Sequence, residues 1–240
     1  MDSIIPKDYE KQHQYMDLVK RRKICRKCYG LKNPSDVCGG RYDQDHIGPW
    51  SSWQGNINSP IVVIGQDWGN PEMFEKSRGF EPFCSETDRN TNGTLVDLIK
   101  SIGISIDRPQ GYKTTGKLFF TNAILCLKQG DASAPVKEEW FDECGREFIK
   151  PLLDIIKPIV VITLGERAYR ALEGSYCLDR SEFRRVVDKS GGIPLFGETR
   201  LFPMYHCGRR ILNTHRNIVQ QRIDWVRVAS FLQQKGISVE

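Results

Sequence analysis

The stretch Pro60-Ile61-Val62-Val63-Ile64-Gly65-Gln66-Asp67-Trp68-Gly69 decides the fold of this 240-residue chain. Its first half is a run of β-branched residues ended by glycine, which predicts a buried parallel strand. Its second half places Asp67 directly beyond that strand. Active sites of open α/β sheets lie beyond the carboxyl ends of the strands, so Asp67 is a candidate site residue.

Strands and helices are predicted to alternate along the rest of the chain. Three further strands are expected at 117–125, 158–165 and 201–205, and helices at 8–23, 94–102, 137–156, 167–173 and 217–234. This alternation predicts a three-layer α/β/α sandwich with a central, mostly parallel four-stranded sheet. We expect Pro151 to kink one helix and Gly174 to end another.

Length and composition predict one soluble domain. The chain is 39% hydrophobic and has no run of about 18 apolar residues, which argues against a membrane span or a secretory leader. We therefore expect a single domain over 1–240, with an N-terminal helix and cysteine loop (1–58) packed on it. We also expect a monomer in the cytoplasm, at the nucleoid of a prokaryote.

The basic residues are clustered, although the formal net charge is only +5. One cluster spans 20–27, and a second runs from Arg209 to Arg227. Such clusters favour a polyanionic partner. The alternative for either cluster is a solvated helix face.

Eight cysteines are present, and a chain of this size does not need disulfides to fold. We therefore expect reduced thiols. Cys25 and Cys28 have the spacing by which two thiolates of one turn reach one metal, and Cys126 and Cys144 form a second, wider pair. Four thiolates suit either zinc or an iron-sulfur cluster, and Cys38 is a competing ligand.

Two further polar residues follow predicted strands. Asn122 and His206 end apolar runs just as Asp67 does, so all three could meet at one edge of the sheet. Each alone has an ordinary structural interpretation, such as a helix cap or a turn. Together, a carboxylate, an amide and an imidazole in one crevice indicate hydrolysis.

These residues carry a resemblance to a known family. Gly65-Gln66-Asp67 followed by an aromatic residue, Thr121-Asn122, and Tyr205-His206 leading to 211–216 resemble the successive motifs of the uracil-DNA glycosylase superfamily. The four cysteines are similar to those of its iron-sulfur-containing (family 4-like) branch. The resemblance covers about residues 25–230. The chain departs from that branch at Asp67, where glutamate is usual, and at Cys207-Gly208, where Pro-Ser is usual.

The resemblance implies a DNA repair enzyme that flips uracil out of DNA and hydrolyses its N-glycosidic bond, leaving an abasic site. Asp67 would activate the attacking water. Its negative charge would also stabilise the sugar, because positive charge develops on the sugar as the bond breaks. His206 would donate a hydrogen bond to uracil O2 as negative charge builds there.

Base recognition is expected to depend on an amide and an aromatic ring. The Asn122 amide can pair with N3–H and O4 of uracil and reject cytosine. The resemblance places Phe83 against the flipped base, with Phe80 as the alternative, and Gln66 at the pocket wall.

The resemblance also implies how DNA is held. Leu212 would fill the gap left by the flipped base, and Arg209, Arg210, His215 and Arg216 would hold phosphates. The alternative for Leu212 is simple packing at the start of the last helix.

The cofactor implied by the resemblance is a [4Fe-4S] cluster on Cys25, Cys28, Cys126 and Cys144, with zinc as the alternative. Two other functions stay open at this point. The chain could be a catalytically silent, metal-containing nucleic-acid-binding protein, or a glycosylase for another deaminated base such as hypoxanthine or xanthine.

Overall fold

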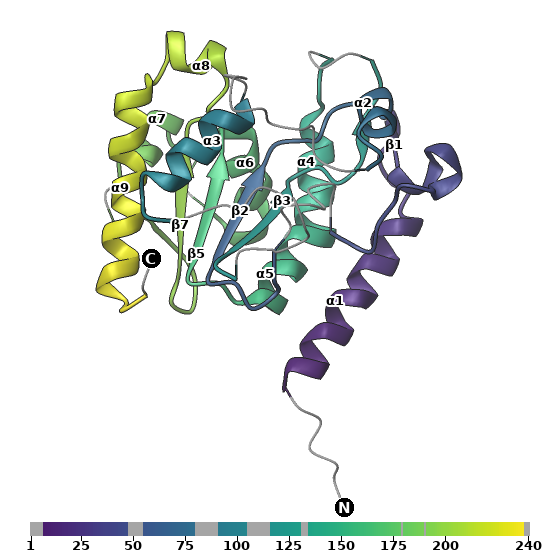
Figure 1. Cartoon of the computed structure of the whole chain (residues 1–240), viewed down its shortest axis with the longest axis horizontal. Coiled ribbons are helices and arrows are strands. Elements are labelled where there is room, and N and C mark those ends of the chain that lie inside the picture. The colour runs from purple at the N-terminus through teal and green to yellow at the C-terminus, as the bar shows by residue number, and fades with distance from the viewer. Residues whose placement is uncertain are drawn as a thin grey trace, which may run out of the picture.

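The computed structural model describes residues 7–47, 55–79, 91–104, 116–130, 134–178, 180–189 and 191–237. A five-stranded sheet in the order β3-β2-β5-β7-β6 lies between layers of helices (Figure 1). The strands are β2 (Ile61–Gly65), β3 (Leu118–Asn122), β5 (Val160–Leu164), β6 (Ile193–Phe196) and β7 (Thr199–Met204). The first four in the sheet order are parallel, which confirms the predicted α/β sandwich.

The sheet has one strand more than the four predicted. Strand β6 pairs antiparallel with β7, with Ile193 opposite Leu201. Only Ile193 of its four residues is buried, and Pro194 is exposed. Proline is tolerated in an edge strand because its missing N–H can face solvent. The strand was missed because it has only four residues and one of them is proline.

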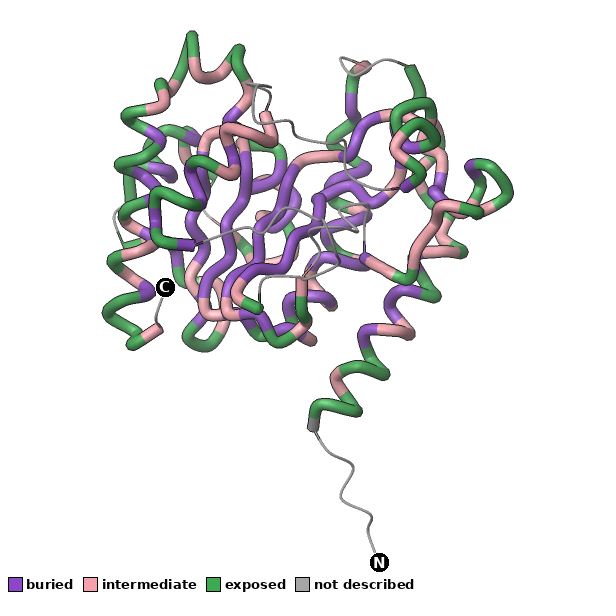
Figure 2. Tube along the Cα trace, viewed as in Figure 1, coloured by how far each residue is buried: buried purple, intermediate pink, exposed green. Residues whose placement is uncertain are grey.

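Both faces of the sheet are covered, and strands β2, β3 and β5 are buried throughout (Figure 2). Val62 and Ile64 belong to the hydrophobic core on one face, and Ile61 and Val63 to the core on the other. The first core also contains residues of α1 (Lys7–Ile24), α4 (Glu138–Cys144), α5 (Lys150–Ile156), α6 (Glu166–Tyr176) and α7 (Phe183–Val187). The second contains residues of α3 (Thr91–Lys100) and α9 (Ile218–Gln234). Burial on both faces explains why the strands are continuous apolar runs.

Two helices depart from their expected course. Between α4 and α5 lies a π-helical segment, Gly145–Ile149, directly before Pro151. The irregularity expected at Pro151 therefore takes the form of a π-bulge. Gly174 does not end α6, which continues to Tyr176 and ends where Cys177 adopts a left-handed conformation (φ 50°). The Tyr176 ring stacks on Phe196 at 5.6 Å, which stabilises the extra turn.

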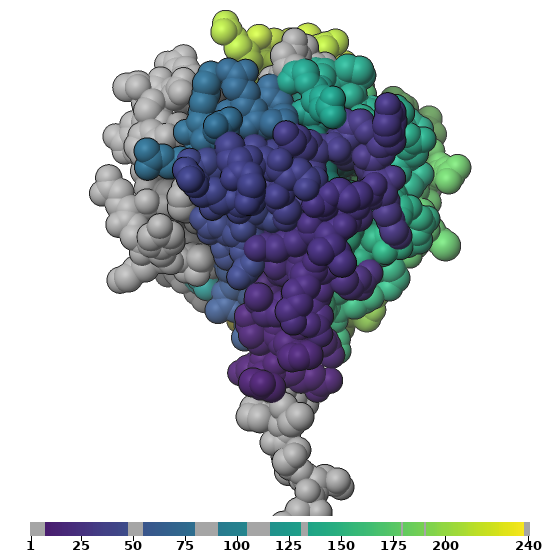
Figure 3. Space-filling model, turned by 90° about the vertical axis from the view of Figure 1, so that its right-hand side faces the viewer, coloured from purple at the N-terminus to yellow at the C-terminus, as the bar shows by residue number. Residues whose placement is uncertain are grey.

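A small second sheet lies beside the cysteine loop. Strands β1 (Leu31–Lys32) and β4 (Leu127–Lys128) pair antiparallel, so they join the segment after α1 to the segment after β3. Helix α1 and the segment that follows it form one face of the molecule (Figure 3). The remaining short helices are α2 (Pro71–Lys76) and α8 (Arg209–Thr214), with single 3-10 turns at Pro34–Asp36 and Cys38–Gly40.

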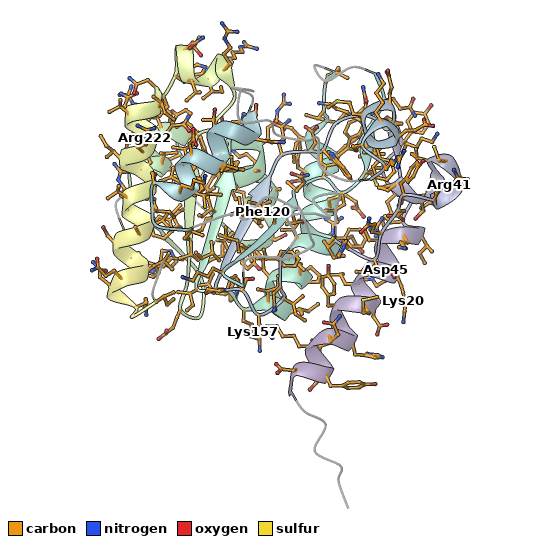
Figure 4. The ribbon with its side chains drawn as sticks, in the orientation of Figure 1. Lys20, Arg41, Asp45, Phe120, Lys157 and Arg222 are labelled. Atoms are coloured by element: carbon orange, nitrogen blue, oxygen red, sulfur yellow. The ribbon has the colours of Figure 1, made fainter. Side chains whose placement is uncertain are left out.

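The carboxyl ends of the four parallel strands lie at one edge of the sheet. Gly65 is opposite Asn122, and Leu164 is opposite Met204. Beyond the strand ends, the Ala123 amide donates to the Gly65 carbonyl at 2.8 Å, so the loops after β2 and β3 start side by side. Figure 4 shows Phe120 within the sheet, with Arg41 and Arg222 at opposite sides of the molecule. No helix in the described ranges is long and apolar enough to cross a membrane.

Candidate active site

The carboxyl edge of the sheet carries the three predicted site residues. Asp67 lies two residues after β2, Asn122 is the last residue of β3, and His206 lies two residues after β7. The Asp67 carboxylate is close enough to His206 to act on its titration. The structure thus brings a carboxylate and an imidazole to one place, beside the amide of the neighbouring strand.

The Asp67 carboxylate is buried and held at both oxygens. Its side chain is 7% exposed, and Oδ2 accepts a hydrogen bond from Gln66 Nε2 at 2.6 Å. Oδ1 lies 3.2 Å from Nζ of Lys128, whose side chain is also 7% exposed. The sequence analysis missed Lys128, because a single lysine in a polar segment is normally exposed. The ion pair lets the site hold a negative charge away from bulk water.

Asn122 is fully buried, and neither Nδ2 nor Oδ1 of its side chain has a hydrogen-bond partner among the described residues. Leaving a buried polar group unpaired costs about 1–3 kcal/mol. The backbone of Asn122 is fixed by pairing with β2, so this cost is built into the fold. A buried amide with a free donor and a free acceptor is suited to a ligand that offers the complementary pair.

The hydrogen bonds of His206 assign its tautomer. Nδ1 accepts from the backbone N–H of Gly208 at 3.0 Å, so in the neutral ring the proton is on Nε2. Burial lowers the pKa of His206, and the smaller opposing effect of Asp67 raises it. The imidazole is therefore neutral at pH 7 and offers Nε2–H as a donor.

Glycine at position 208 makes room for this arrangement. A Cβ there would lie 2.9 Å from Nδ1 of His206, closer than side chains tolerate. Glycine in place of the usual serine at this position therefore leaves space for the ring.

The backbone around His206 is held from two sides. Gln221 of α9 donates from Nε2 to the carbonyls of His206 (3.3 Å) and Arg216 (3.2 Å). Gly165 has φ +94°, and a Cβ on it would lie 3.3 Å from Cβ of His206. Gln221 was missed in the sequence analysis, because its role depends on a contact between segments 15 residues apart.

A family model described as the uracil DNA glycosylase superfamily matches residues 52–227, which is more than half of the chain. The chain belongs to the uracil DNA glycosylase superfamily. Membership indicates a hydrolase that removes bases from DNA during repair. The matched range contains Asp67, Asn122 and His206, whereas Cys25 and Cys28 lie before it. A search of curated proteins found no match to this chain.

Two predicted base contacts have different outcomes. The Gln66 side chain is directed at Asp67, and its carbonyl accepts from the Ile124 amide at 3.0 Å. Gln66 is therefore placed where it can orient the carboxylate. Phe83 and its alternative Phe80 lie outside the described residues, so stacking on the base stays a prediction.

Leu212 lies in helix α8, which is not among the helices predicted from the sequence. Its amide donates to the Gly208 carbonyl at 3.1 Å, which starts a helical turn in a segment of good helix formers, Arg209–Leu212. Leu212 is partly exposed and belongs to none of the hydrophobic clusters formed by the described residues. The short helix α8 thus carries a partly exposed apolar side chain six residues after His206.

The cations near Leu212 fall into two groups. Arg209, Arg210 and His215 are exposed. Arg216, by contrast, donates from Nε and Nη2 to the two oxygens of buried Asp224, at 2.9 and 2.6 Å. Arg216 therefore ties the end of α8 to α9, and the phosphate contact predicted for it would have to compete with this pair.

The four predicted cysteine ligands line one cavity of about 270 Å³. The cavity lies between the loop after α1, the segment after β3 and the end of α4, and its cysteines are Cys25, Cys28, Cys126 and Cys144. All four are free, and the Cys28 and Cys144 thiols are hydrogen-bonded to each other. Burial raises the pKa of the Cys126 thiol to about 12, so a thiolate there needs a compensating positive charge.

The two candidate cofactors, zinc and an iron-sulfur cluster, place different demands on the four thiols of this cavity. A zinc ion requires four donors, with sulfur about 2.3 Å from the metal. Within the ranges described above, no three or more His, Cys, Asp or Glu side chains form a group that could hold a metal ion. Four thiols around a cavity suit the larger iron-sulfur cluster, which is held by four cysteines. Cys38 does not line the cavity; it is exposed, and its thiol is hydrogen-bonded to Glu75.

The cysteine loop is held in place by a buried ion pair. Arg22 Nη1 lies 2.6 Å from Oδ1 of Asp43, with both side chains nearly inaccessible. Asn33 donates from Nδ2 to the carbonyls of Arg22 (2.8 Å) and Cys25 (2.9 Å). These bonds order the loop independently of any bound group.

The basic residues between the cysteines are ion-paired. Arg26 lies 2.6 Å from Asp36, and Lys27 lies 2.9 Å from both Glu143 and Glu147. These acidic partners offset part of the positive charge of the cluster at 20–27, which was the reason to expect a polyanionic partner there. The exposed cations of α8 are therefore better placed to bind phosphates.

Proposed function

We propose that this protein is a monofunctional uracil-DNA glycosylase that flips uracil out of DNA and hydrolyses its N-glycosidic bond. The observation that carries this proposal is the buried Asn122 amide, whose donor and acceptor have no partner in the part of the chain that the structure describes, at the same edge of the sheet as Asp67. Uracil offers N3–H to the amide oxygen and O4 to the amide nitrogen. Cytosine offers the reverse pattern on this edge, so an amide held in that orientation rejects it.

The other two residues supply the chemistry. Bond cleavage places positive charge on the sugar and negative charge on the departing base. The Asp67 carboxylate stabilises the sugar and orients the water that attacks it. His206 donates from Nε2–H to uracil O2, and its neutral form is sufficient for that hydrogen bond.

Substrate range is tested with oligonucleotides that each contain one uracil, hypoxanthine or xanthine, in single and double strands. We expect uracil to be excised fastest. Preference for hypoxanthine would contradict the role given to Asn122. Tight binding without excision of any base would favour the silent nucleic-acid-binding alternative.

Leu212 is proposed to fill the gap that the flipped base leaves in duplex DNA. Leu212→Ala should lower excision from double-stranded DNA by about tenfold, since unstacking costs a few kcal/mol, and should change excision from single strands little. The matched control is Val219→Ala, which shortens a 61% exposed aliphatic side chain on the neighbouring helix α9. Equal losses on both DNA forms would remove the wedge role.

We propose that Cys25, Cys28, Cys126 and Cys144 hold a [4Fe-4S] cluster, as in the iron-sulfur branch of the superfamily. When bound, the cluster would cross-link the N-terminal loop to α4 and the segment after β3. Hydrolysis transfers no electron, so its role would be structural.

Anaerobically purified protein should contain about four iron and four sulfide per chain. Cys126→Ser should lower both contents and the melting temperature, whereas Cys38→Ser, outside the cavity, should leave them unchanged. Stoichiometric zinc without iron or sulfide would favour the zinc alternative.

A further inference from the structure

We propose that Lys128 is a positioning residue for the reaction, because its ammonium group holds the Asp67 carboxylate in the orientation that the attacking water requires. This inference rests on the proposed glycosylase function. It adds a residue that acts through Asp67 and not on the DNA.

The geometry leaves the carboxylate little freedom. Lys128 Nζ lies 3.2 Å from Oδ1 and Gln66 Nε2 lies 2.6 Å from Oδ2 of Asp67. Each oxygen therefore has its own donor, one of them charged. A carboxylate held at both oxygens cannot rotate without losing a charge-assisted hydrogen bond.

The backbone of Lys128 is attached to the loop that carries Asp67. The Lys128 amide donates to the Gly69 carbonyl at 3.0 Å, two residues beyond the carboxylate. On its other side Lys128 pairs with Leu31 in the β1–β4 sheet, and the Leu31 amide donates to the Cys28 carbonyl at 3.2 Å. Lys128 thus lies between the cysteine cavity and the carboxylate, hydrogen-bonded through its amide to Gly69 and paired in register with Leu31.

Stability alone does not explain a buried ion pair at this place. The free energy lost when two charges are removed from water cancels much of the free energy gained from their attraction. Replacing such a pair by apolar residues is therefore often neutral or stabilising. A second buried pair, Arg22 with Asp43, orders the cysteine loop. The Lys128–Asp67 pair instead fixes a group that the reaction uses, which is a reason to retain it.

The first test compares Lys128→Gln with wild type under single-turnover conditions. We expect the excision rate constant to fall about 10- to 100-fold, as for a misplaced catalytic group, while the dissociation constant for DNA is unchanged. The matched control is Lys150→Gln, which removes a lysine of α5 whose Nζ lies 2.8 Å from Asp154, and it should alter neither quantity. An unchanged rate constant for Lys128→Gln would overturn the proposal.

The second test places the same substitution in the Asp67→Asn background. A positioning residue has nothing left to position there, so Lys128→Gln should cause no further loss of excision and no loss of DNA affinity. It should also lower the melting temperature less in the Asp67→Asn background than in wild type, since the ion pair is already broken there. An equal loss in both backgrounds, or weaker DNA binding, would mean that Lys128 contacts the substrate itself.

The double variant carries neither buried charge, so it is expected to fold even if Lys128→Gln alone does not. Its melting temperature also separates this inference from the proposed function. If wild type excises no base, the glycosylase proposal fails. The thermal comparison still tests the pair, and a melting temperature that Lys128→Gln lowers equally in both backgrounds would overturn the coupling.

Discussion

Asp67→Asn is expected to lower the excision rate constant by roughly 10²- to 10⁴-fold while DNA affinity is retained. Asparagine keeps the size of the side chain but carries no negative charge to stabilise the cationic sugar. It also cannot accept a proton from the attacking water. Single-turnover excision and DNA binding, measured on the same preparation, would check both parts of this prediction.

The same substitution should also destabilise the protein. It removes Asp67 as a counterion of the buried Lys128 ammonium, and breaking a buried pair costs about 3–5 kcal/mol. The assays therefore belong well below the melting temperature of the variant, and thermal unfolding must be recorded beside them.

Glu173→Gln is a suitable control for this loss of charge. Glu173 is 11% exposed and ion-paired with Arg170 on α6, a helix that starts at Glu166 next to the site and runs away from it. Its replacement should reduce stability and leave excision by folded protein unchanged. A comparable loss of excision in both variants would contradict a chemical role for Asp67.

Asn122→Leu is expected to have opposite effects on stability and activity. Both polar atoms of the buried amide lack a partner among the described residues, so replacing it with an apolar side chain of similar size should raise the free energy of unfolding by about 1–3 kcal/mol. Excision of uracil should fall by about 100-fold or more, because the base is no longer held in place. Chemical denaturation and single-turnover excision would measure the two effects.

Asn33→Leu provides the matched comparison. Asn33 is also buried, but Nδ2 donates to two carbonyls and Oδ1 accepts from the Ser35 amide at 3.0 Å. Leucine there should lower the free energy of unfolding. If Asn122→Leu were equally destabilising, the Asn122 amide would have to be paired in the free protein, and its assignment to the base would lose its basis.

Much of the fold could be predicted from the sequence because the central strands are buried on both faces. Such strands are continuous apolar runs, as in 60–65 and 158–165, and their positions were predicted to within two residues. Helix α9 also follows its signals, with Asn217 and Gln220 forming a capping box. The edge strand β6 and the short helix α8 were missed, because neither has enough residues to show the repeating pattern of apolar and polar residues that marks a strand or a helix.

The site was only partly predictable for a different reason. Asp67, Asn122 and His206 stand at strand ends, where the topology of a parallel sheet brings distant residues together. Lys128 and Gln221 act through contacts between segments, and nothing in their local sequence distinguishes them from solvated side chains. The buried state of Lys128 becomes visible only when the β1–β4 sheet places it beside Asp67.

The cysteines show a similar division. Their spacing predicted a set of four, and the structure places Cys25 and Cys28 around one cavity with Cys126 and Cys144, which lie 98 to 119 residues away in the chain. Spacing alone did not separate zinc from an iron-sulfur cluster. The position of Cys38 outside the cavity removes the fifth candidate.

The central claim is that Asp67 and His206 remove uracil from DNA. The most direct test is alkaline strand cleavage of a labelled oligonucleotide with one uracil, after incubation with wild type, Asp67→Asn or His206→Ala. We predict cleavage at the uracil position with wild type and at most about one hundredth of that rate with either variant. Wild type that leaves uracil in place in both single and double strands, or variants that cleave as fast as wild type, would contradict it.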